Sequence, residues 1–400
     1  MIDTTFLDWP FFDDSHRDLA LKLDDWCQRE LAPLGHSEDD VDGQCRKLLS
    51  LLAKGGWLRY AVPKAYGGVM EELDVRSLCL IRETLGRYSG LADFVFAMQG
   101  LGSGTVTVAG SETQKQDYLP RVANGTFCAA FALTELASGS DVANMETAAE
   151  DRGDHYVVNG AKTYISNGGI ADFYTLFVRT GEAPGARGIS AMIVDADTPG
   201  LEIAERIHVM APHPLATLTF TNMKVPKDKL ISDAGTGFKA AMGTLDIFRT
   251  TVGAAGLGFA RRALEDALER TTTRKLFGKE LVQQPVVQAD LAEMALKVDT
   301  SALLIYRSGW TRDVMGRRNS REAAMAKLHA TETAQEVIDK SLQMHGGLGV
   351  VHGQMVESLY REIRALRIYE GASEVQRVVI ARQLLDQYAS SQAAIKEAAQ

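Results

Sequence analysis

A single carboxylate near the end of the chain, Glu370, stands where two stretches of helical pattern meet. Gly371 follows it and interrupts the periodicity. Ser373 and Gln376 have the spacing of a capping box, which predicts that a new helix begins just after Ser373. A carboxylate at such a junction could act as a proton acceptor, because burial raises its pKa while a helix N-terminus lowers it. The alternative is that Glu370 caps the helix and faces water.

A second group of residues with chemical potential lies on a predicted strand at 161–167. Alternation with a period of two would place Lys162, Tyr164 and Ser166 on one face of this strand. A tyrosine ring and a nearby hydroxyl could stack on a planar heterocycle and hydrogen-bond to it. The same residues could equally form a solvated strand face, so both interpretations stay open.

Three further stretches carry glycines or a guanidinium of the kind that contacts phosphate. The Gly-Leu-Gly-Ser-Gly run at 100–104 follows no predicted strand, so we interpret it as small residues at a close helix contact. The Arg274 guanidinium could donate two hydrogen bonds to phosphate oxygens in a bidentate arrangement, or it could be solvated. The Gln-Met-His-Gly-Gly-Leu-Gly run at 343–349 follows a predicted helix, so it is not a Rossmann fingerprint.

The composition of the chain indicates which class of protein contains these residues. The chain has 400 residues, of which 46% are hydrophobic and 24% are charged, as in a soluble globular protein of two or three structural units. Its net charge of −9 argues against a nucleic-acid surface. The four cysteines form no CxxC pair and no metal spacing, which predicts buried, reduced thiols and no metal. Without a signal-like start or a membrane-length apolar run, we expect a cytoplasmic protein that does not enter membranes.

The elements that must position these residues follow the order helical, β, helical. Hydrophobic periodicity predicts helices over 13–125. Strands are expected at 127–133, 156–158, 161–167, 174–179, 189–194, 201–206 and 216–225, with a hairpin turn at Asn159-Gly160. Helices return at 237–272, 284–315, 320–345, 354–366 and about 374–388. This predicts a mainly α protein with three domains: helical at 1–126, β at 127–235 and helical at 236–400.

Taken together, these stretches resemble the acyl-CoA dehydrogenases, flavoenzymes that desaturate acyl thioesters between Cα and Cβ. Their Tyr-Glu-Gly-Thr-x-x-x-Gln-Arg segment stands here as Tyr-Glu-Gly-Ala-Ser-Glu-Val-Gln-Arg at 369–377. The resemblance runs from about residue 62 to residue 382 and implies two helical bundles flanking a small barrel-like β domain. It also implies that Glu370 is the catalytic base. Some members place the base just before the arginine that corresponds to Arg249, but Phe248 stands there in this chain.

The resemblance assigns the flavin to residues of the expected β domain. Phe-Ala-Leu-Thr-Glu-Leu-Ala-Ser-Gly-Ser-Asp at 131–141 matches the family's Ala-Leu-Thr-Glu-Pro-x-Ala-Gly-Ser-Asp, with leucine at 136 and serine at 138 as departures. Thr134 and the backbone before it would bind the flavin, and Ser140 would contact the pantetheine arm. Tyr164 takes the place of a tryptophan beside the flavin ring, and Ser166 that of a hydroxyl bonded to flavin N5. The implied contributors before Thr134 are Phe131 and Leu133.

Other cofactor and substrate contacts are implied in the C-terminal helical region. Arg-Lys-Leu-Phe-Gly at 274–278 resembles a segment that reaches the pyrophosphate and adenine of a neighbouring subunit's cofactor, which involves Arg274 and Phe277. The glutamine usual seven residues further on is replaced by Pro285, with Gln284 beside it. The 343–349 run matches the family's Gln-x-x-Gly-Gly-x-Gly. The remaining implied residues are Gln343, Gly346 and Gly347 for the cofactor, and Arg249 and Gly371 for the substrate.

The function implied is FAD-dependent dehydrogenation of an acyl-CoA, with Glu370 removing the α-proton and flavin N5 taking the β-hydride. Electron-transfer flavoprotein would accept the electrons, and the enzyme would be a homotetramer that binds neither nucleic acid nor membranes. Three alternatives stay open: a flavin oxidase or monooxygenase of the superfamily, a dehydrogenase of a carrier-protein-bound acyl group, and a catalytically silent scaffold. The sequence does not give the length or branching of the acyl group.

Overall fold

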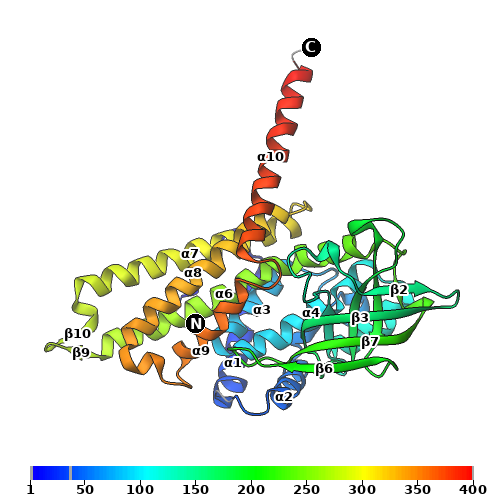
Figure 1. Cartoon of the computed structure of the whole chain (residues 1–400). Coiled ribbons are helices and arrows are strands. Elements are labelled where there is room, and N and C mark those ends of the chain that lie inside the picture. Colours follow the sequence, from blue (N-terminus) through cyan, green and yellow to red (C-terminus); the bar gives the residue numbers. More distant parts are fainter. Residues whose placement is uncertain (1–2, 36–37, 399–400) are drawn as a thin grey trace. The chain divides into compact units, whose positions relative to one another are not determined.

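The computed structural model describes residues 3–35 and 38–398 (Figure 1). The chain folds into two compact units, which we describe separately. The first unit takes Met1–Arg29, Val75–Gly90 and Arg249–Gln400, and the second takes Glu30–Asp74 and Leu91–Phe248.

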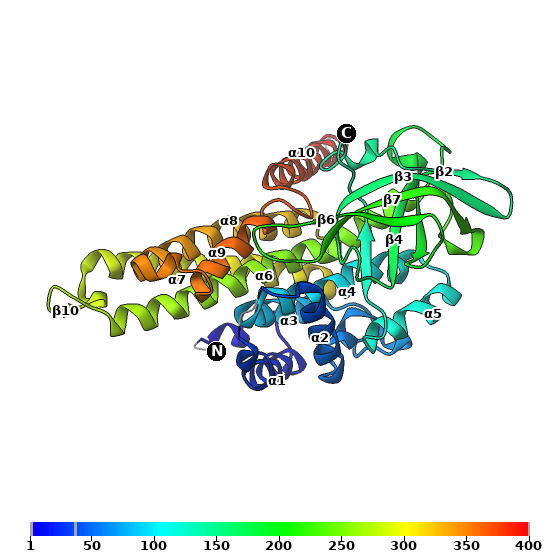
Figure 2. The ribbon, with the colours of Figure 1, turned by 60° about the horizontal axis from the view of Figure 1, so that its bottom comes forward.

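An eight-stranded sheet forms the centre of the second unit (Figure 2). Its order is β6-β7-β3-β2-β4-β5-β8, with β1 added parallel to β4. The strands are β1 (Ala129–Ala132), β2 (Ala148–Asp151), β3 (His155–Ser166), β4 (Phe173–Arg179), β5 (Ile189–Asp195), β6 (Leu201–Ile207), β7 (Leu215–Pro226) and β8 (Leu230–Ile231).

Both faces of the central strand β4 are buried. Tyr174 and Leu176 enter one apolar cluster of the second unit, whereas Phe173 and Phe177 enter another. Successive side chains of a strand point to opposite faces, so this division shows that the sheet is covered on both sides at β4. A buried strand of this kind reads as a continuous apolar run, as 173–178 does.

The hairpin expected at Asn159-Gly160 is wrong. These two residues lie inside β3, which pairs with β7 along its length and shifts register between Val158 and Gly160. Gly160 is needed there because a Cβ would lie 2.7 Å from the Cα of Thr147. The actual reversal joins β2 to β3, where Arg152 N donates to His155 O and Gly153 has φ +92°.

The helical part of the second unit comprises α2 (Val41–Lys54), most of α4 (Gly90–Ala109), α5 (Glu112–Ala123) and the first part of α6 (Gly237–Thr273), up to Phe248. The glycine run at 100–104 lies within α4, as predicted. A Cβ on Gly102 would lie 2.7 Å from Ala129 Cβ, and one on Gly100 would lie 2.5 Å from the Phe248 ring. The small residues therefore let this helix approach its neighbours closely.

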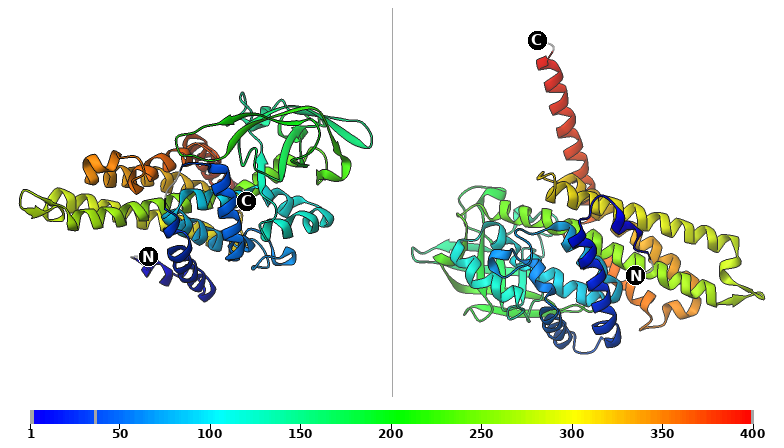
Figure 3. Two further views of the ribbon diagram at one scale, coloured as in Figure 1. Left: turned by 90° about the horizontal axis from the view of Figure 1, so that it is seen from below. Right: turned by 180° about the vertical axis from the view of Figure 1, so that it is seen from behind.

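The first unit is a bundle of long helices (Figure 3). Small residues permit close packing in it as well, since a Cβ on Gly253 of α6 would lie 3.2 Å from Ala326 O of α8. Its elements are α1 (Asp14–Glu30), α3 (Val75–Tyr88), α6 (Gly237–Thr273, from Arg249 on), β9 (Lys275–Leu276), β10 (Lys279–Glu280), α7 (Pro285–Asp313), α8 (Ser320–His345), η9 (Gly346–Val350), α9 (Met355–Leu366) and α10 (Ser373–Ala398).

The last helix is longer than the sequence predicts and lacks the expected capping box. α10 starts at Ser373 as expected, but it continues to Ala398 rather than to about 388, and its distal part extends away from α7 and α8 (Figures 1 and 3). Several of its apolar side chains are more than half exposed, namely Val378, Leu384, Leu385, Tyr388 and Ile395. The expected capping box is wrong, because the Ser373 hydroxyl donates to Glu332 and the Gln376 amide donates to loop carbonyls.

All four cysteines are buried and free, which confirms the expectation from their spacing. No helix within residues 3–35 and 38–398 combines the length and apolar character needed to cross a membrane. In the same residues, no group of His, Cys, Asp and Glu side chains is arranged to hold a metal ion.

Candidate active site

In the first unit, Glu370 lies in the loop between α9 and α10. It is half-buried and adopts a left-handed backbone conformation with φ +52°, followed by Gly371 at φ +89°. A left-handed conformation costs a residue with a side chain roughly 1–2 kcal/mol, so the surrounding contacts must hold it in place.

Two buried side chains supply those contacts. Lys327 of α8 donates from Nζ to the Gly371 carbonyl at 2.8 Å. Gln376 of α10 donates from Nε2 to the same carbonyl at 2.7 Å and to the Glu370 carbonyl at 3.3 Å. These hydrogen bonds hold the loop backbone immediately after the Glu370 side chain.

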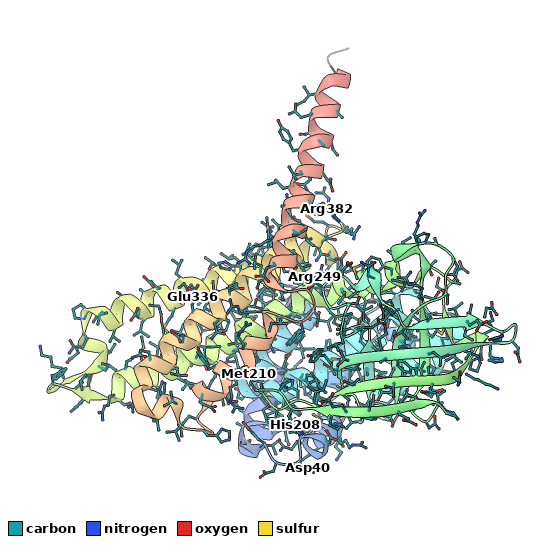
Figure 4. The ribbon with its side chains drawn as sticks, in the orientation of Figure 1. Asp40, His208, Met210, Arg249, Glu336 and Arg382 are labelled. Carbon is teal, nitrogen blue, oxygen red and sulfur yellow. The ribbon has the colours of Figure 1, made fainter. Side chains whose placement is uncertain are left out.

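The charges around this loop are close enough to perturb one another. Burial lowers the pKa of Lys327 to about 8, although attraction to Glu370 opposes this effect and repulsion from Arg249 adds to it. Arg249 is itself buried on α6, in the same unit (Figure 4). Glu370, Gly371 and Arg249, which the sequence singled out, are therefore gathered around Lys327.

In the second unit, a buried ion pair organises the segment that follows β1. Lys162 of β3 donates from Nζ to the Leu133 carbonyl at 3.1 Å and to Glu135 Oε1 at 2.7 Å. Glu135 also accepts from the backbone N–H groups of Glu146 and Thr147, at 2.6 and 2.9 Å. The backbone around Thr134 is thereby tied to β3.

Burial and hydrogen bonding together set the ionisation of this pair. It lowers the pKa of the Lys162 ammonium to about 8, despite the hydrogen bond and attraction from Glu135. Burial would raise the pKa of Glu135, but hydrogen bonds from Glu146 N–H, Lys162 and Thr147 outweigh it and lower that pKa. The pair therefore stays charged near neutral pH, with its lone pairs occupied.

The prediction that Lys162, Tyr164 and Ser166 share one strand face is wrong. β3 shifts register between Lys162 and Ile165, and Tyr164 has φ +55°. As a result Lys162 is 0% exposed, whereas Tyr164 turns outward and is 56% exposed. Ser166 is half-buried at the end of the strand.

The other predicted flavin and substrate residues of the second unit differ in exposure. The Phe131 ring packs against Phe177 with centroids 4.8 Å apart, and Leu133 is buried, so both serve the core of this unit. Thr134 is half-buried, and its carbonyl accepts from Thr163 N–H at 2.9 Å. Ser140 is exposed in the turn that follows.

That turn is closed by its own polar groups. Glu135 and Ser138 exchange backbone hydrogen bonds of 3.3 and 3.1 Å, and the Ser138 hydroxyl donates to the Asp141 carbonyl at 2.7 Å. Leu136, which stands where the resembled family has proline, is 86% exposed.

A pocket of about 760 Å³ lies in the first unit, where the ends of α6 and α8 meet η9. Arg274, Gln343, Gly346 and Gly347 line it together, as the sequence predicts for residues that share a ligand. A Cβ on either glycine would meet nothing within 4 Å, so the backbone there is open to a ligand. The Arg274 guanidinium and the Gln343 carboxamide, beside this open glycine backbone, are donors that suit a pyrophosphate.

The same pocket also carries groups that would not favour an anion. Asp290 and Asp339 line it, although Lys340 pairs with Asp290. Phe277, predicted beside Arg274, is not among the lining residues. It sits between β9 and β10 with φ +51° and is 90% exposed. Pro285 is the first residue of α7 and fits that position because the first helical N–H has no partner to lose.

Left-handed backbone marks three of the predicted residues. Among the described residues other than glycine, positive φ occurs at Asp40, Tyr164, Asn167, Asn222, Ser232, Phe277 and Glu370. Asp, Asn and Ser are small polar residues, and the first two tolerate this conformation well. The three with larger side chains are all residues that the sequence singled out for chemistry.

Sequence reasoning missed Lys327 and Glu135, and it gave Gln376 only a capping role. A signal for Lys327 existed in the run Ala-Ala-Met-Ala-Lys-Leu at 323–328, where a lysine interrupts small apolar residues. No comparable signal marked Glu135, because its role depends on the backbone path of residues 146 and 147.

Comparison with known proteins bears on both units. Family profiles match three consecutive stretches: acyl-CoA dehydrogenase N-terminal domain at 13–126, middle domain at 130–223 and C-terminal domain at 235–385. A 3-(aryl)acrylate reductase of Clostridium sporogenes is 33% identical over 378 residues, which cover 94% of this chain and 100% of the relative. The caffeyl-CoA reductase-Etf complex subunit CarC of Acetobacterium woodii is 34% identical over 380 residues, covering 94% and 99%.

The solved structures agree with these sequence matches. Butyryl-CoA dehydrogenase from Megasphaera elsdenii superimposes with a TM-score of 0.87 at 32% identity, covering 94% of this chain and 99% of that one.

Proposed function

The chain belongs to the acyl-CoA dehydrogenase family, and from this premise we propose that Glu370 is its catalytic base. Members of the family are FAD-dependent oxidoreductases that act on CH–CH bonds, and this chain is such an enzyme. The observation that supports Glu370 is the way its loop is held. A carboxylate in an unfavourable backbone conformation, clamped by two buried donors, is fixed in direction before any substrate arrives.

The proposed division of labour follows from the residue types. The Glu370 carboxylate accepts the α-proton, and the backbone N–H of Glu370 donates to the thioester carbonyl, where negative charge develops. Bound FAD supplies the acceptor for the β-hydride. Arg249 of α6 and Gly371 of the loop both lie close to Lys327 and would contact the substrate, and Ser140 would contact its pantetheine arm.

We propose two groups of cofactor contacts, one in each unit. In the first unit, the pocket lined by Arg274, Gln343, Gly346 and Gly347 would hold the pyrophosphate of a neighbouring subunit's cofactor, and Phe277 would contribute to the same contact. In the second unit, the hydroxyls of Thr134 and Ser166 and the exposed ring of Tyr164 suit the flavin. Phe131 and Leu133 would contribute only backbone groups, because their side chains pack into the core.

We also propose domain boundaries at 1–126, 127–235 and 236–400. The four buried free thiols support a cytoplasmic location, because disulfides are rare in that compartment. A homotetramer is proposed because α10 exposes a row of apolar side chains that a copy of the chain could cover. Electron-transfer flavoprotein is the proposed redox partner, since one relative is named as part of a reductase-Etf complex.

A second candidate is the same chemistry in the opposite direction, which two relatives named as reductases favour. The Glu370 side chain would then deliver a proton to Cα of an unsaturated thioester. Mixing chemically reduced protein with enoyl thioesters under nitrogen would show rapid return of the oxidised flavin spectrum if this direction prevails. Rapid return on exposure to oxygen alone would instead indicate an oxidase, and bleaching only by carrier-protein thioesters would indicate that substrate class.

The decisive experiment is anaerobic flavin bleaching by a panel of acyl-CoAs, with wild type and Glu370→Gln. Loss of a positioned general base should slow bleaching by about 10²–10⁴-fold. The flavin spectrum, FAD content and acyl-CoA binding should barely change, because the amide keeps the shape of the side chain. Glu336→Gln, on the outer side of α8, is the matched control (Figure 4). Equal bleaching by Glu370→Gln and wild type would place the base elsewhere, with Asp246 the next carboxylate to test.

A further inference from the structure

Lys327 is a buried lysine whose ammonium is directed at the loop of the proposed base. Its side chain is 0% exposed, and its Nζ donates to the carbonyl of Gly371, the residue after Glu370. We infer that Lys327 is a positioning residue for Glu370, which it serves by holding the loop through the Gly371 carbonyl and by placing a positive charge at that loop. This inference rests on the function proposed above.

The hydrogen bond alone does not account for a lysine here. The Gly371 carbonyl already accepts a 2.7 Å hydrogen bond from Gln376, which is also fully buried. Burial of an ammonium is unfavourable, whereas an apolar side chain of similar volume would carry no such cost. What the lysine adds, and methionine could not, is the positive charge.

The charge of Lys327 is directed mainly at Glu370. Three carboxylates favour the ammonium form, namely Glu370 of the loop, Glu332 of α8 and Glu374 of α10, and Glu370 has the largest effect. Arg249 of α6 opposes it. Glu332 is already paired with Arg367, with 2.6 Å between Oε2 and Nη2.

The remaining carboxylate, Glu374, is exposed, and its charge is therefore screened by water. Because the attraction between Lys327 and Glu370 is mutual, the ammonium favours the ionised carboxylate, the form that accepts a proton. With burial lowering its pKa to about 8, Lys327 is still mostly protonated at neutral pH.

The inference predicts a change in pH dependence rather than a uniform loss of rate. In Lys327→Met, the apparent pKa of the bleaching rate should rise by about 1 or more, because an opposite charge has been removed. On the acidic side the variant should therefore bleach about tenfold more slowly than wild type. At high pH, where the carboxylate is ionised in both proteins, the two rates should converge.

The experiment is anaerobic stopped-flow bleaching by one acyl-CoA over a series of pH values. Lys327→Met should fold, because it removes the cost of burying an ammonium and the Gly371 carbonyl keeps its hydrogen bond from Gln376. Lys327→Gln serves as a second uncharged variant and should show the same displacement of the profile. Lys297→Met, which removes a lysine paired with Glu336 on the outer side of α8, should leave the profile unchanged.

A double variant adds a readout that a purely structural lysine would not give. In Glu370→Gln, no carboxylate remains for the ammonium to act on, so adding Lys327→Met should change the residual rate little. A full additional loss, or a loss in the single variant that is equal at every pH, would overturn the inference. If the wild type is bleached by no thioester, the proposed function itself fails. A wild type that bleaches alongside Lys327 variants with an unchanged profile refutes only the role of Lys327.

Discussion

Gly371→Ala is the substitution that most directly tests how the Glu370 loop is held. The residue has φ +89°, so an added Cβ strains the backbone whatever surrounds it. The same Cβ would lie 2.5 Å from Nε2 of Gln376, well inside contact distance. Gln376 would have to move away, and its 2.7 Å hydrogen bond to the Gly371 carbonyl would break.

The expected cost is the sum of these two effects. A side chain in the left-handed region costs roughly 1–2 kcal/mol. A lost hydrogen bond costs about 1 kcal/mol, and the Gly371 carbonyl keeps its bond from Lys327. The total, about 2–3 kcal/mol, is smaller than the typical stability of about 5–15 kcal/mol, so the variant should fold. Its loop should nevertheless shift, and a displacement of about 1 Å slows a positioned reaction by up to roughly 10²-fold.

Gly353→Ala provides the matched control in the same unit. Gly353 has φ +86°, almost the same as Gly371, but its added Cβ meets nothing within 4 Å. Urea denaturation should find Gly371→Ala less stable than Gly353→Ala by about 1 kcal/mol, with the same dependence on urea concentration. Anaerobic bleaching should be slowed in Gly371→Ala alone. If both variants lost the same stability and bleached at the wild-type rate, the clamp on the loop would have no role.

Three other predictions concern separate features. Arg274→Ala should weaken FAD binding, which is measured as faster release of fluorescent FAD on dilution. Flavin bleaching in the FAD-loaded variant should keep the wild-type rate. If the variant retained FAD as tightly as wild type, the proposed contact between Arg274 and the pyrophosphate would be excluded. Burial lowers the pKa of Lys162 in the folded protein to about 8. Below that pH, Lys162 is protonated in both the folded and the unfolded state, so the folded state bears the full cost of burying the charge. Above pH 8 the unfolded state binds more protons, so wild type should gain stability relative to Lys162→Met between about pH 8 and 10, and parallel unfolding free energies would contradict this. Leu385→Asp on α10 should reduce the mass found by light scattering, whereas Ser390→Asp, a polar exposed site on the same helix, should not.

Much of the fold could be predicted from periodicity, because long amphipathic helices and buried strands leave clear patterns. The order helical, β, helical and the family are confirmed. The error at Asn159-Gly160 has a physical cause. Local turn preference gave way to pairing between β3 and β7, which continues on both sides of Gly160. The glycine is present because the chain passes close to Thr147, a contact that no local pattern reveals.

The side-chain arrangement of the candidate site was harder to predict from the sequence than the fold. The bulge in β3 moves Lys162 inward and Tyr164 outward, and a bulge has no signature in a pattern of period two. The spacing of Ser373 and Gln376 predicts a cap, but tertiary partners compete for these side chains. Glu332 receives the serine hydroxyl, and the Glu370 loop receives the glutamine amide. Such choices depend on segments far apart in sequence.

The left-handed conformations of Tyr164, Phe277 and Glu370 have a consequence for how this sequence can change over time. At each position the backbone alone would prefer glycine or asparagine. Random substitution under selection for stability alone should therefore drift towards those two residues and lose the large side chains. A relative that retains tyrosine, phenylalanine and glutamate there is under selection for what the side chains do. A relative with glycine or asparagine at all three positions should have less backbone strain. Such a relative should keep the fold but lose the activity that depends on these side chains.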